Sequence, residues 1–231
     1  MVARDIWGLA LDIVLPRFCF GCREWRTYLC DQCAKQKINY SPTLRCAKCN
    51  RMATDGRTHV RCQSKQTIDG LWAMAQKDQL LTRMIWEAKY QGAYEVLQPL
   101  GRLLSENLPI WLVNFDVVVP IPLHAKRERK RGFNQAEKLG GQLAEQCEIE
   151  LITQALVRTK ESKAQALIEE KQARLENVRG VFGKGPEIGE VKGKRVLLVD
   201  DVSTTGATLL NAGRILKRHG VGQVWGVVVC R

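Results

Sequence analysis

After residue 65 the chain alternates between short apolar runs and amphipathic stretches, and this alternation restricts the fold more than any other feature. Uninterrupted apolar runs are typical of strands buried on both faces, whereas apolar residues every three or four positions are typical of helices that cover a core. The runs predict strands over 67–76, 115–122, 155–159, 195–201 and 223–230. The periodic stretches predict helices over 78–90, 97–108, 132–146 and 207–220. Buried strands joined by helices imply an α/β fold with a mainly parallel sheet.

The segment VLLVDDVSTTGATL, residues 196–209, joins one of these strands to a helix. Parallel α/β sheets bind ligands at the carboxyl ends of their strands, and Asp200 and Asp201 lie at such an end. The turn that follows offers backbone N–H groups, hydroxyls and the positive end of a helix dipole, all of which favour phosphate. The turn and the start of the helix comprise Ser203, Thr204, Thr205, Gly206, Ala207 and Thr208.

One ligand would satisfy both the acids and the turn. Adjacent carboxylates repel a phosphate, but they accept hydrogen bonds from a diol or help to hold a hydrated cation. A ribose phosphorylated on its 5′ oxygen would offer its diol to Asp200 and Asp201 and its phosphate to the turn. The alternative interpretation is an ordinary strand–turn–helix junction with an acidic N-cap.

Seven of the nine cysteines lie between residues 19 and 62, and they recur with two-residue spacers together with one histidine. A C-x-x-C turn directs both sulfurs at one point, and two such turns complete a tetrahedral zinc shell. We therefore expect two structural zinc ions. The simplest pairing is sequential, although a crossed pairing stays open; the expected ligands are Cys19, Cys22, Cys30 and Cys33 for one ion, and Cys46, Cys49, His59 and Cys62 for the other. A disulfide scaffold is disfavoured, because we find no secretion signal.

The net charge of +12 favours polyanionic partners such as nucleic acid, phosphorylated metabolites or a membrane face, against the alternative of a basic but inert surface. No stretch approaches the roughly 20 apolar residues of a membrane helix. Residues 6–14 predict an amphipathic helix that ends before Pro16, in preference to a signal peptide. We accordingly expect a cytoplasmic protein.

A dense group of cations follows the strand at 115–122. Residues 126–131 read KRERKR, and Lys130 and Arg131 precede Asn134 and Gln135 at the start of the next predicted helix. We expect a loop here. Such a loop can neutralise a pyrophosphate or bind a nucleic-acid backbone. The alternative is a solvated connection between a strand and a helix.

The run of apolar residues, Asp-Asp and Thr-Thr-Gly-x-Thr resembles the phosphoribosyl-pyrophosphate motif of type I phosphoribosyltransferases. Together with VPIPLHAKRERKRGFNQAEKL, AQALIEEKQARLENVRGVF and the cysteine pairs, it is similar to the ComF family, which is linked to DNA uptake in bacterial transformation. The similarity extends over nearly the whole chain. It implies a zinc-bearing domain over 1–65 and a phosphoribosyltransferase domain over 66–231. His59 departs from the usual cysteine of the family.

The resemblance also implies ligands and roles. The loop with Arg131 would bind pyrophosphate with Mg²⁺, and the stretch 162–182, which contains Arg174, would cover the site as a hood. A charged, solvated helix is the alternative for that stretch.

Two functions follow from these features. In the first, the protein is an enzyme that transfers a phosphoribosyl group to a nitrogen nucleophile, with Asp200 and Asp201 as catalytic residues. In the second, the zinc segment and the basic loop bind single-stranded DNA during uptake, in concert with other uptake proteins, and the sugar-phosphate pocket only senses or anchors a ligand. No residue set identifies the acceptor, and none indicates an oligomeric state.

Overall fold

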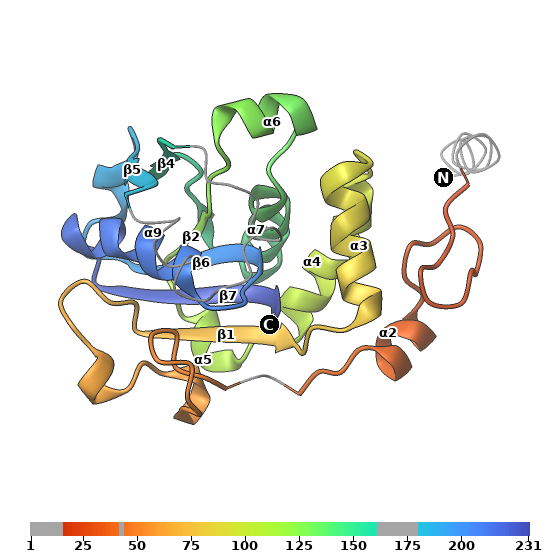
Figure 1. Ribbon diagram of the computed structural model, residues 1–231, viewed down its shortest axis with the longest axis horizontal. Coiled ribbons are helices and arrows are strands. Elements are labelled where there is room, and N and C mark those ends of the chain that lie inside the picture. The colour runs from red at the N-terminus through yellow and green to blue at the C-terminus, as the bar shows by residue number, and fades with distance from the viewer. Residues whose placement is uncertain (1–15, 42–43, 161–179) are drawn as a thin grey trace.

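The computed structural model describes residues 16–41, 44–160 and 180–231. Within these ranges five strands form one parallel sheet (Figure 1). Their order across the sheet is β1 (Gly70–Ala75), β7 (Gln223–Cys230), β6 (Arg195–Val202), β2 (Val117–Pro120) and β3 (Glu150–Leu151). The predicted α/β fold with a mainly parallel sheet is therefore confirmed.

The central strand β6 shows why the strands are continuously apolar. Leu197 and Val199 pack into the apolar cluster on one face of the sheet, whereas Val196 and Leu198 pack into the cluster on the other face. Successive side chains of a strand point to opposite faces, so a strand covered on both sides needs an apolar residue at every position.

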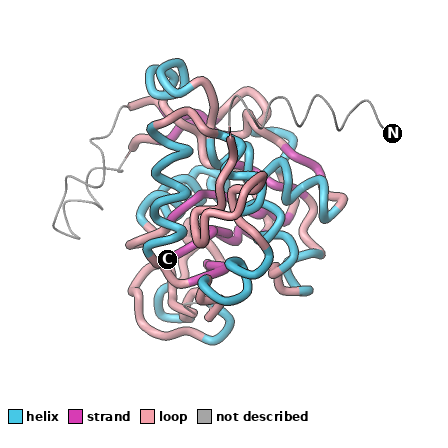
Figure 2. Tube along the Cα trace, turned by 90° about the vertical axis from the view of Figure 1, so that its right-hand side faces the viewer, coloured by secondary structure: helices cyan, strands magenta, loops and turns pink. Residues whose placement is uncertain are grey.

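Helices cover both faces, and Figure 2 shows the strands in magenta between them. One face carries α3 (Gln79–Tyr90), the short turn η3 (Tyr94–Val96), α4 (Leu97–Glu106), α5 (Ile110–Val113) and α7 (Gln135–Cys147), and the other carries α9 (Ala207–Arg218). Helix α3 begins at the expected place because the side chain of Asp78 accepts a hydrogen bond from the N–H of Leu81, at 2.8 Å. The four helices predicted from periodicity are all present, with ends that differ by a few residues.

Helix α7 forms despite its paired glycines, which usually weaken a helix. A Cβ atom on Gly140 would lie 3.1 Å from Cγ1 of Val118 on β2. The glycine therefore lets the helix pack closely on the sheet, and this contact offsets the low helix propensity.

Two expectations differ from the structure. The strand predicted over 155–159 is present as β4 (Leu156–Arg158), but it pairs antiparallel with β5 (Phe182–Lys184) in a separate two-stranded sheet. The segment 126–131, which we expected to be a loop, forms the short helix α6 (Ala125–Arg131). Lys, Arg and Glu are good helix formers, and Gly132 ends the helix in the left-handed conformation with φ of 83°. A further turn, η5 (Ile188–Val191), precedes β6.

We call residues 16–41 the first cysteine hairpin and residues 44–65 the second, after the antiparallel bridges Phe18–Trp25 and Arg45–Met52, and the two pack on opposite faces of the sheet. The first leads into helix α2 (Asp31–Lys37), and its apolar residues Leu29 and Ile38 join the cluster of α3 and α4. The second contains the turns η1 (Thr54–Gly56) and η2 (Val60–Cys62), and its Ala47 joins the cluster of α9. The division of the chain at residue 65 stays a prediction about independent folding.

The amphipathic helix predicted over 6–14 lies outside the described residues. In the part of the chain that the structure describes, no helix has the length and apolar character needed to cross a membrane.

Candidate functional site

A cavity of about 370 Å³ opens at the carboxyl end of β6. It lies where β6, α3, α6, the start of α7, the start of α9 and β4 converge. Its described lining residues are Lys77, Thr82, Ile85, Trp86, Lys89, Tyr90, Ile121, Leu123, Arg127, Arg131, Asn134, Gln135, Ala136, Arg158, Asp200, Asp201, Val202, Thr204 and Thr208. This is the edge at which parallel sheets bind their ligands.

The two acids at the end of β6 occupy different environments. Asp201 is buried, and its Oδ2 lies 2.5 Å from Nζ of Lys89, which comes from the last turn of α3. Asp200 is half-buried, and its Oδ1 accepts a hydrogen bond from the N–H of Asp201 at 2.9 Å. Lys89 thus supplies the cation that compensates for two adjacent carboxylates.

Burial and the charge of Asp201 raise the pKa of Asp200 to about 7, even though the ammonium of Lys89 lowers it. Burial lowers the pKa of Lys89, but the attraction of Asp201 and Asp200 outweighs burial and raises that pKa above its usual value. Asp200 therefore exchanges a proton near neutral pH while Lys89 stays charged.

The turn after the acids leads into the N-terminus of α9, and the N–H of Ser203 at its start donates to the carbonyl of Cys230 at 3.1 Å. Gly206 adopts a φ of 78° directly before α9. Thr204 and Thr208 line the cavity, whereas Thr205 caps the turn through its Oγ1, which accepts from the N–H of Ala207 at 3.3 Å. The hydroxyl of Ser203 is buried and has no hydrogen-bond partner among the described residues.

Backbone of the second cysteine hairpin lies directly behind this turn. A Cβ atom on Gly206 would lie 2.8 Å from the carbonyl oxygen of Ala47. The terminal Arg231 joins the same hairpin to the sheet, because its guanidinium donates to the carbonyl of Arg45 at 3.1 Å and to Oδ1 of Asn50 at 2.8 Å. The hairpin therefore supports the turn from outside the cavity.

The start of α7 contributes one structural amide and one that faces the cavity. Asn134 caps the helix through Oδ1, and its Nδ2 donates to the carbonyl of Ile121 at 3.0 Å. Gln135 is 2% exposed, its Oε1 accepts from Arg131, and its Nε2 has no partner in the described part of the chain. A buried donor without a partner costs stability unless a ligand satisfies it.

Five residues of the cavity lining were not predicted from the sequence. Lys89, Arg158, Tyr90, Trp86 and Lys77 all line the cavity. The position of Lys89 could have been inferred from its spacing. It follows the buried Ile85 by four residues, so its side chain lies beside the apolar stripe of the helix.

The predicted site residues divide by position. Seven of them line the cavity: Asp200, Asp201, Thr204, Thr208, Arg131, Asn134 and Gln135. Ser203, Thr205, Gly206 and Ala207 build the turn beside it, whereas Lys130 is exposed on α6, outside the lining that the described residues define. Arg174 lies outside the described residues.

The eight predicted zinc ligands form two groups in the sequential pairing, and the ligand atoms of each group lie within 4.8 Å of one another. The Sγ atom of Cys30 lies 3.7 Å from that of Cys19 and 3.6 Å from that of Cys22. A tetrahedral zinc ion with Zn–S bonds of about 2.3 Å places its sulfurs roughly 3.8 Å apart, so the first group fits zinc.

The second group is also compatible with zinc. Nδ1 of His59 lies 3.2 Å from Sγ of Cys49, and Nε2 of the same ring donates to the carbonyl of Met52 at 2.8 Å. This second hydrogen bond leaves Nδ1 available as a metal ligand.

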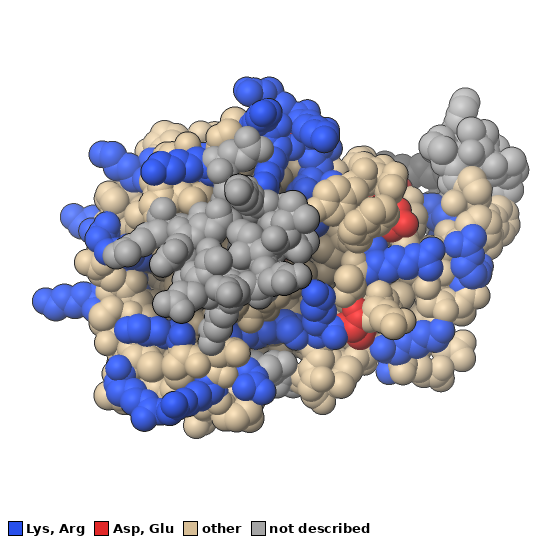
Figure 3. All heavy atoms as spheres, viewed as in Figure 1, with Lys and Arg blue, Asp and Glu red and all other residues tan. Residues whose placement is uncertain are grey.

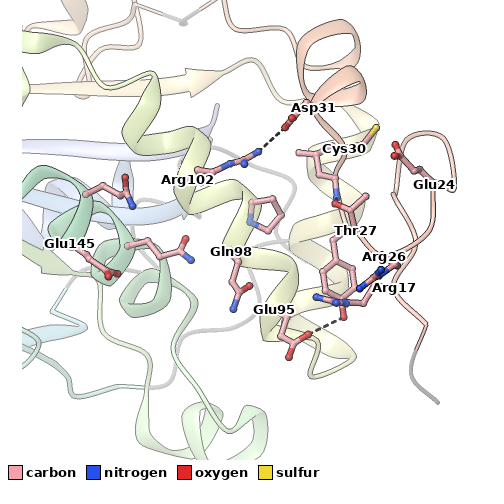
Figure 4. Close-up of a pocket in the computed structure, with 15 residues that line it drawn as sticks. Arg17, Glu24, Arg26, Thr27, Cys30, Asp31, Glu95, Gln98, Arg102 and Glu145 are labelled. Carbon is pink, nitrogen blue, oxygen red and sulfur yellow. Dashed lines mark hydrogen bonds and ion pairs between the residues drawn. The ribbon is translucent and has the colours of Figure 1, made fainter. Parts of the chain in front are cut away.

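A larger depression of about 550 Å³ separates the first cysteine hairpin from α4 and α7 (Figure 4). Its described lining mixes three arginines with four acids. Figure 4 shows Arg102 paired with Asp31, and the two charged groups lie 3.0 Å apart. The hydroxyl of Tyr28 donates to Oε2 of Glu95 at 3.4 Å. These pairs join the first cysteine hairpin to α4 and η3, so we interpret the depression as part of the interface between the hairpin and the helices.

Comparisons with known proteins agree with this geometry. The family described as phosphoribosyl transferase domain matches residues 114–231. Competence protein F of Haemophilus influenzae is 32% identical over 64% of this chain and 67% of that protein. The DNA utilization protein YhgH of Escherichia coli K12 is 27% identical over 95% of this chain and 99% of that protein. Competence protein ComFC of Bacillus subtilis is 23% identical over 94% of this chain and 86% of that protein.

Proposed function

Because the chain belongs to the phosphoribosyl transferase domain family, and within it to the ComF proteins, we propose that its cavity binds phosphoribosyl pyrophosphate. The charge of the cavity is the observation that carries this proposal. Among its described lining residues, Lys77, Lys89, Arg127, Arg131 and Arg158 oppose only two carboxylates. Such an excess suits a polyphosphate, while the carboxylates suit the hydroxyls of a sugar.

Each part of the ligand has a matching part of the cavity. The turn over 203–208 would hold the 5′-phosphate through its N–H groups and hydroxyls. Asp200 and Asp201 would accept hydrogen bonds from the ribose hydroxyls. Arg131 would hold the pyrophosphate, and Nε2 of Gln135, which has no partner among the described residues, would gain an acceptor. Mg²⁺ bound with the pyrophosphate would neutralise part of its charge.

Phosphoribosyl transfer is the reaction that this arrangement would support. The bond between the anomeric carbon and the pyrophosphate oxygen breaks, the oxygen keeps the electron pair, and a nitrogen nucleophile bonds to the carbon. Positive charge develops on the sugar ring while the bond to pyrophosphate breaks, and the carboxylate of Asp201, together with Asp200 when it is ionised, would stabilise that charge. Arg131 balances the charge on the leaving group.

We also propose that both cysteine groups hold structural zinc. Each group offers four ligands and so leaves no open coordination position for a reacting water. Zinc would fix the second hairpin, whose backbone supports the turn at Gly206.

Titration calorimetry with phosphoribosyl pyrophosphate and Mg²⁺ tests the proposal. We expect saturable binding to the wild type, and at least tenfold weaker binding to an Asp200→Asn, Asp201→Asn double variant. Glu190→Gln is the matched control, because Glu190 is exposed on η5 and does not belong to the described cavity lining. Absence of binding to the wild type would refute the proposal.

A second candidate function is binding of single-stranded DNA during DNA uptake, with the cavity as a sensor or anchor. The relatives named as competence and DNA utilization proteins favour it, as does the surface of α6, where Lys and Arg side chains gather (Figure 3). We place this role in the cytoplasm, together with other uptake proteins.

Salt dependence tests the second candidate. Each phosphate contact should contribute a slope of about −0.7 to the plot of log affinity against log salt. Removal of residues 1–65 would show whether the zinc segment takes part. No measurable binding at about 50 mM salt would count against the candidate.

A further inference from the structure

Exposed aromatic side chains gather at the mouth of the cavity. Trp86 is 48% exposed, Tyr90 is 58% exposed, and their ring centroids lie 5.5 Å apart on successive turns of α3. Both residues line the same cavity as Asp200 and Asp201. Exposed aromatic rings forgo a large burial energy, so two of them held together beside charged groups indicate a surface that binds something planar or apolar.

The two rings are held on a rigid support. The opposite face of α3 is fixed in the core by the buried residues Leu81, Met84, Ile85 and Ala88. A stacking surface on a packed helix loses little conformational entropy when a ligand binds, which increases affinity.

Charges near the rings connect them to the sugar-phosphate part of the cavity. The guanidinium of Arg131 lies 5.8 Å from the centroid of Tyr90. Lys89, next to Tyr90 in the helix, is paired with Asp201. Aromatic rings interleaved with cations are the arrangement by which proteins stack the bases of nucleotides and hold their phosphates.

We propose that Trp86 and Tyr90 form a stacking subsite for a nucleobase. This inference rests on the proposed binding of a 5-phosphoribosyl group, because the base is expected beside a sugar whose hydroxyls meet Asp200 and Asp201. A cavity of about 370 Å³ lies within the range of small-molecule sites, about 300–1,000 Å³. The shared chemistry is a planar nitrogen heterocycle, which a free base or the end of a DNA strand can supply.

Calorimetry with AMP and with ribose 5-phosphate isolates the contribution of the base. We expect the wild type to bind AMP at least tenfold more tightly than ribose 5-phosphate. Alanine substitution of a stacking residue weakens binding by about 5- to 150-fold. The Trp86→Ala, Tyr90→Ala double variant should therefore lose most of the preference for AMP while its affinity for ribose 5-phosphate changes less than twofold.

Two controls separate stacking from general damage. A Trp86→Phe, Tyr90→Phe double variant keeps the rings and should keep most of the preference. Trp25→Ala removes a side chain that is 47% exposed on the first cysteine hairpin, and it should leave both affinities unchanged. Thermal melting of every variant shows whether the fold is intact.

The outcomes distinguish this inference from the function on which it rests. Equal affinity for AMP and ribose 5-phosphate, with both bound, would overturn the stacking subsite and leave the sugar-phosphate cavity standing. An equal loss for both ligands in the alanine variant would also overturn it. Failure of the wild type to bind AMP, while it binds phosphoribosyl pyrophosphate, would likewise overturn the subsite, whereas failure to bind phosphoribosyl pyrophosphate would refute the proposed function itself.

Two further probes identify the source of the base. Adenine that binds only in the presence of phosphoribosyl pyrophosphate, and only with the rings intact, would support a free base as the acceptor. If a ten-nucleotide DNA strand binds only when the rings are intact, and adenine does not bind, the result would support the end of a DNA strand as the source of the base. If both probes bind equally well with and without the rings, the subsite is refuted.

Discussion

Removal of Lys89 should destabilise the protein because it leaves two adjacent carboxylates without their cation. At 2.5 Å, opposite unit charges attract by about 7 kcal/mol if the effective dielectric constant is about 20. Desolvation offsets part of this, and removal of one partner of a buried pair costs about 3–5 kcal/mol. The Lys89 side chain is 26% exposed and that of Asp201 is 8% exposed, so we take the lower end, about 3 kcal/mol.

Thermal denaturation measures this loss. A chain of this size changes its Tm by about 2–4 °C for each kcal/mol, so Lys89→Met should melt about 6–12 °C below the wild type. Lys77→Met is the matched control, because Lys77 lines the same cavity but is exposed, and it should change stability by less than about 0.5 kcal/mol.

A double-mutant cycle isolates the pair. When Asp201→Asn is combined with Lys89→Met, the double variant should be more stable than the sum of the single losses predicts, by about 1.5 kcal/mol or more. A Lys89→Met protein that melts within about 2 °C of the wild type, or a cycle with no coupling, would refute the view that Lys89 stabilises the acid pair.

Three further predictions concern pH, the turn and zinc. Because folding raises the pKa of Asp200 from 3.8 to about 7, protonation of this side chain stabilises the folded state, and this contribution to the free energy of unfolding is lost as the pH rises through that window. Asp200→Asn should therefore make the melting temperature depend less on pH between 3.8 and about 7. Gly206→Ala should cost at least 1 kcal/mol (about the penalty of a positive φ) and weaken ligand binding, whereas Gly189→Ala, with open space around it, should be neutral in the same unfolding titration. Elemental analysis should find two zinc ions per chain, and one after His59→Ala or Cys33→Ser, while an unchanged zinc content would contradict the two sites.

The sequence predicted four of the five strands of the sheet and the helices α3, α4, α7 and α9, because burial imposes a period that is visible in the residues themselves. It did not predict the two-residue edge strand β3, which is too short to show a pattern. It did not predict that β4 leaves the main sheet to pair with β5, because strand pairing depends on contacts between distant segments. It did not distinguish a loop from the helix α6 either, since a charged segment of seven residues has no apolar stripe that reveals its period.

Site residues that stand next to one another in the sequence could be predicted. Those that meet only in the folded chain could not. Asp200, Asp201 and the turn stand together in the sequence, whereas Lys89 reaches Asp201 from a helix more than 100 positions away along the chain. Spacing predicted two zinc groups and favoured the sequential pairing, but it left a crossed pairing open. Their packing on opposite faces of the sheet, and the contact of Ala47 with Gly206, depend on tertiary structure that spacing does not encode.

A crystal structure of the protein soaked with phosphoribosyl pyrophosphate and Mg²⁺ tests the central claim most directly. We predict electron density for the 5′-phosphate within the turn over 203–208, and for the ribose hydroxyls beside Asp200 and Asp201. The claim would be contradicted if the ligand density lay at another site and the ligand contacted neither the turn nor the two carboxylates.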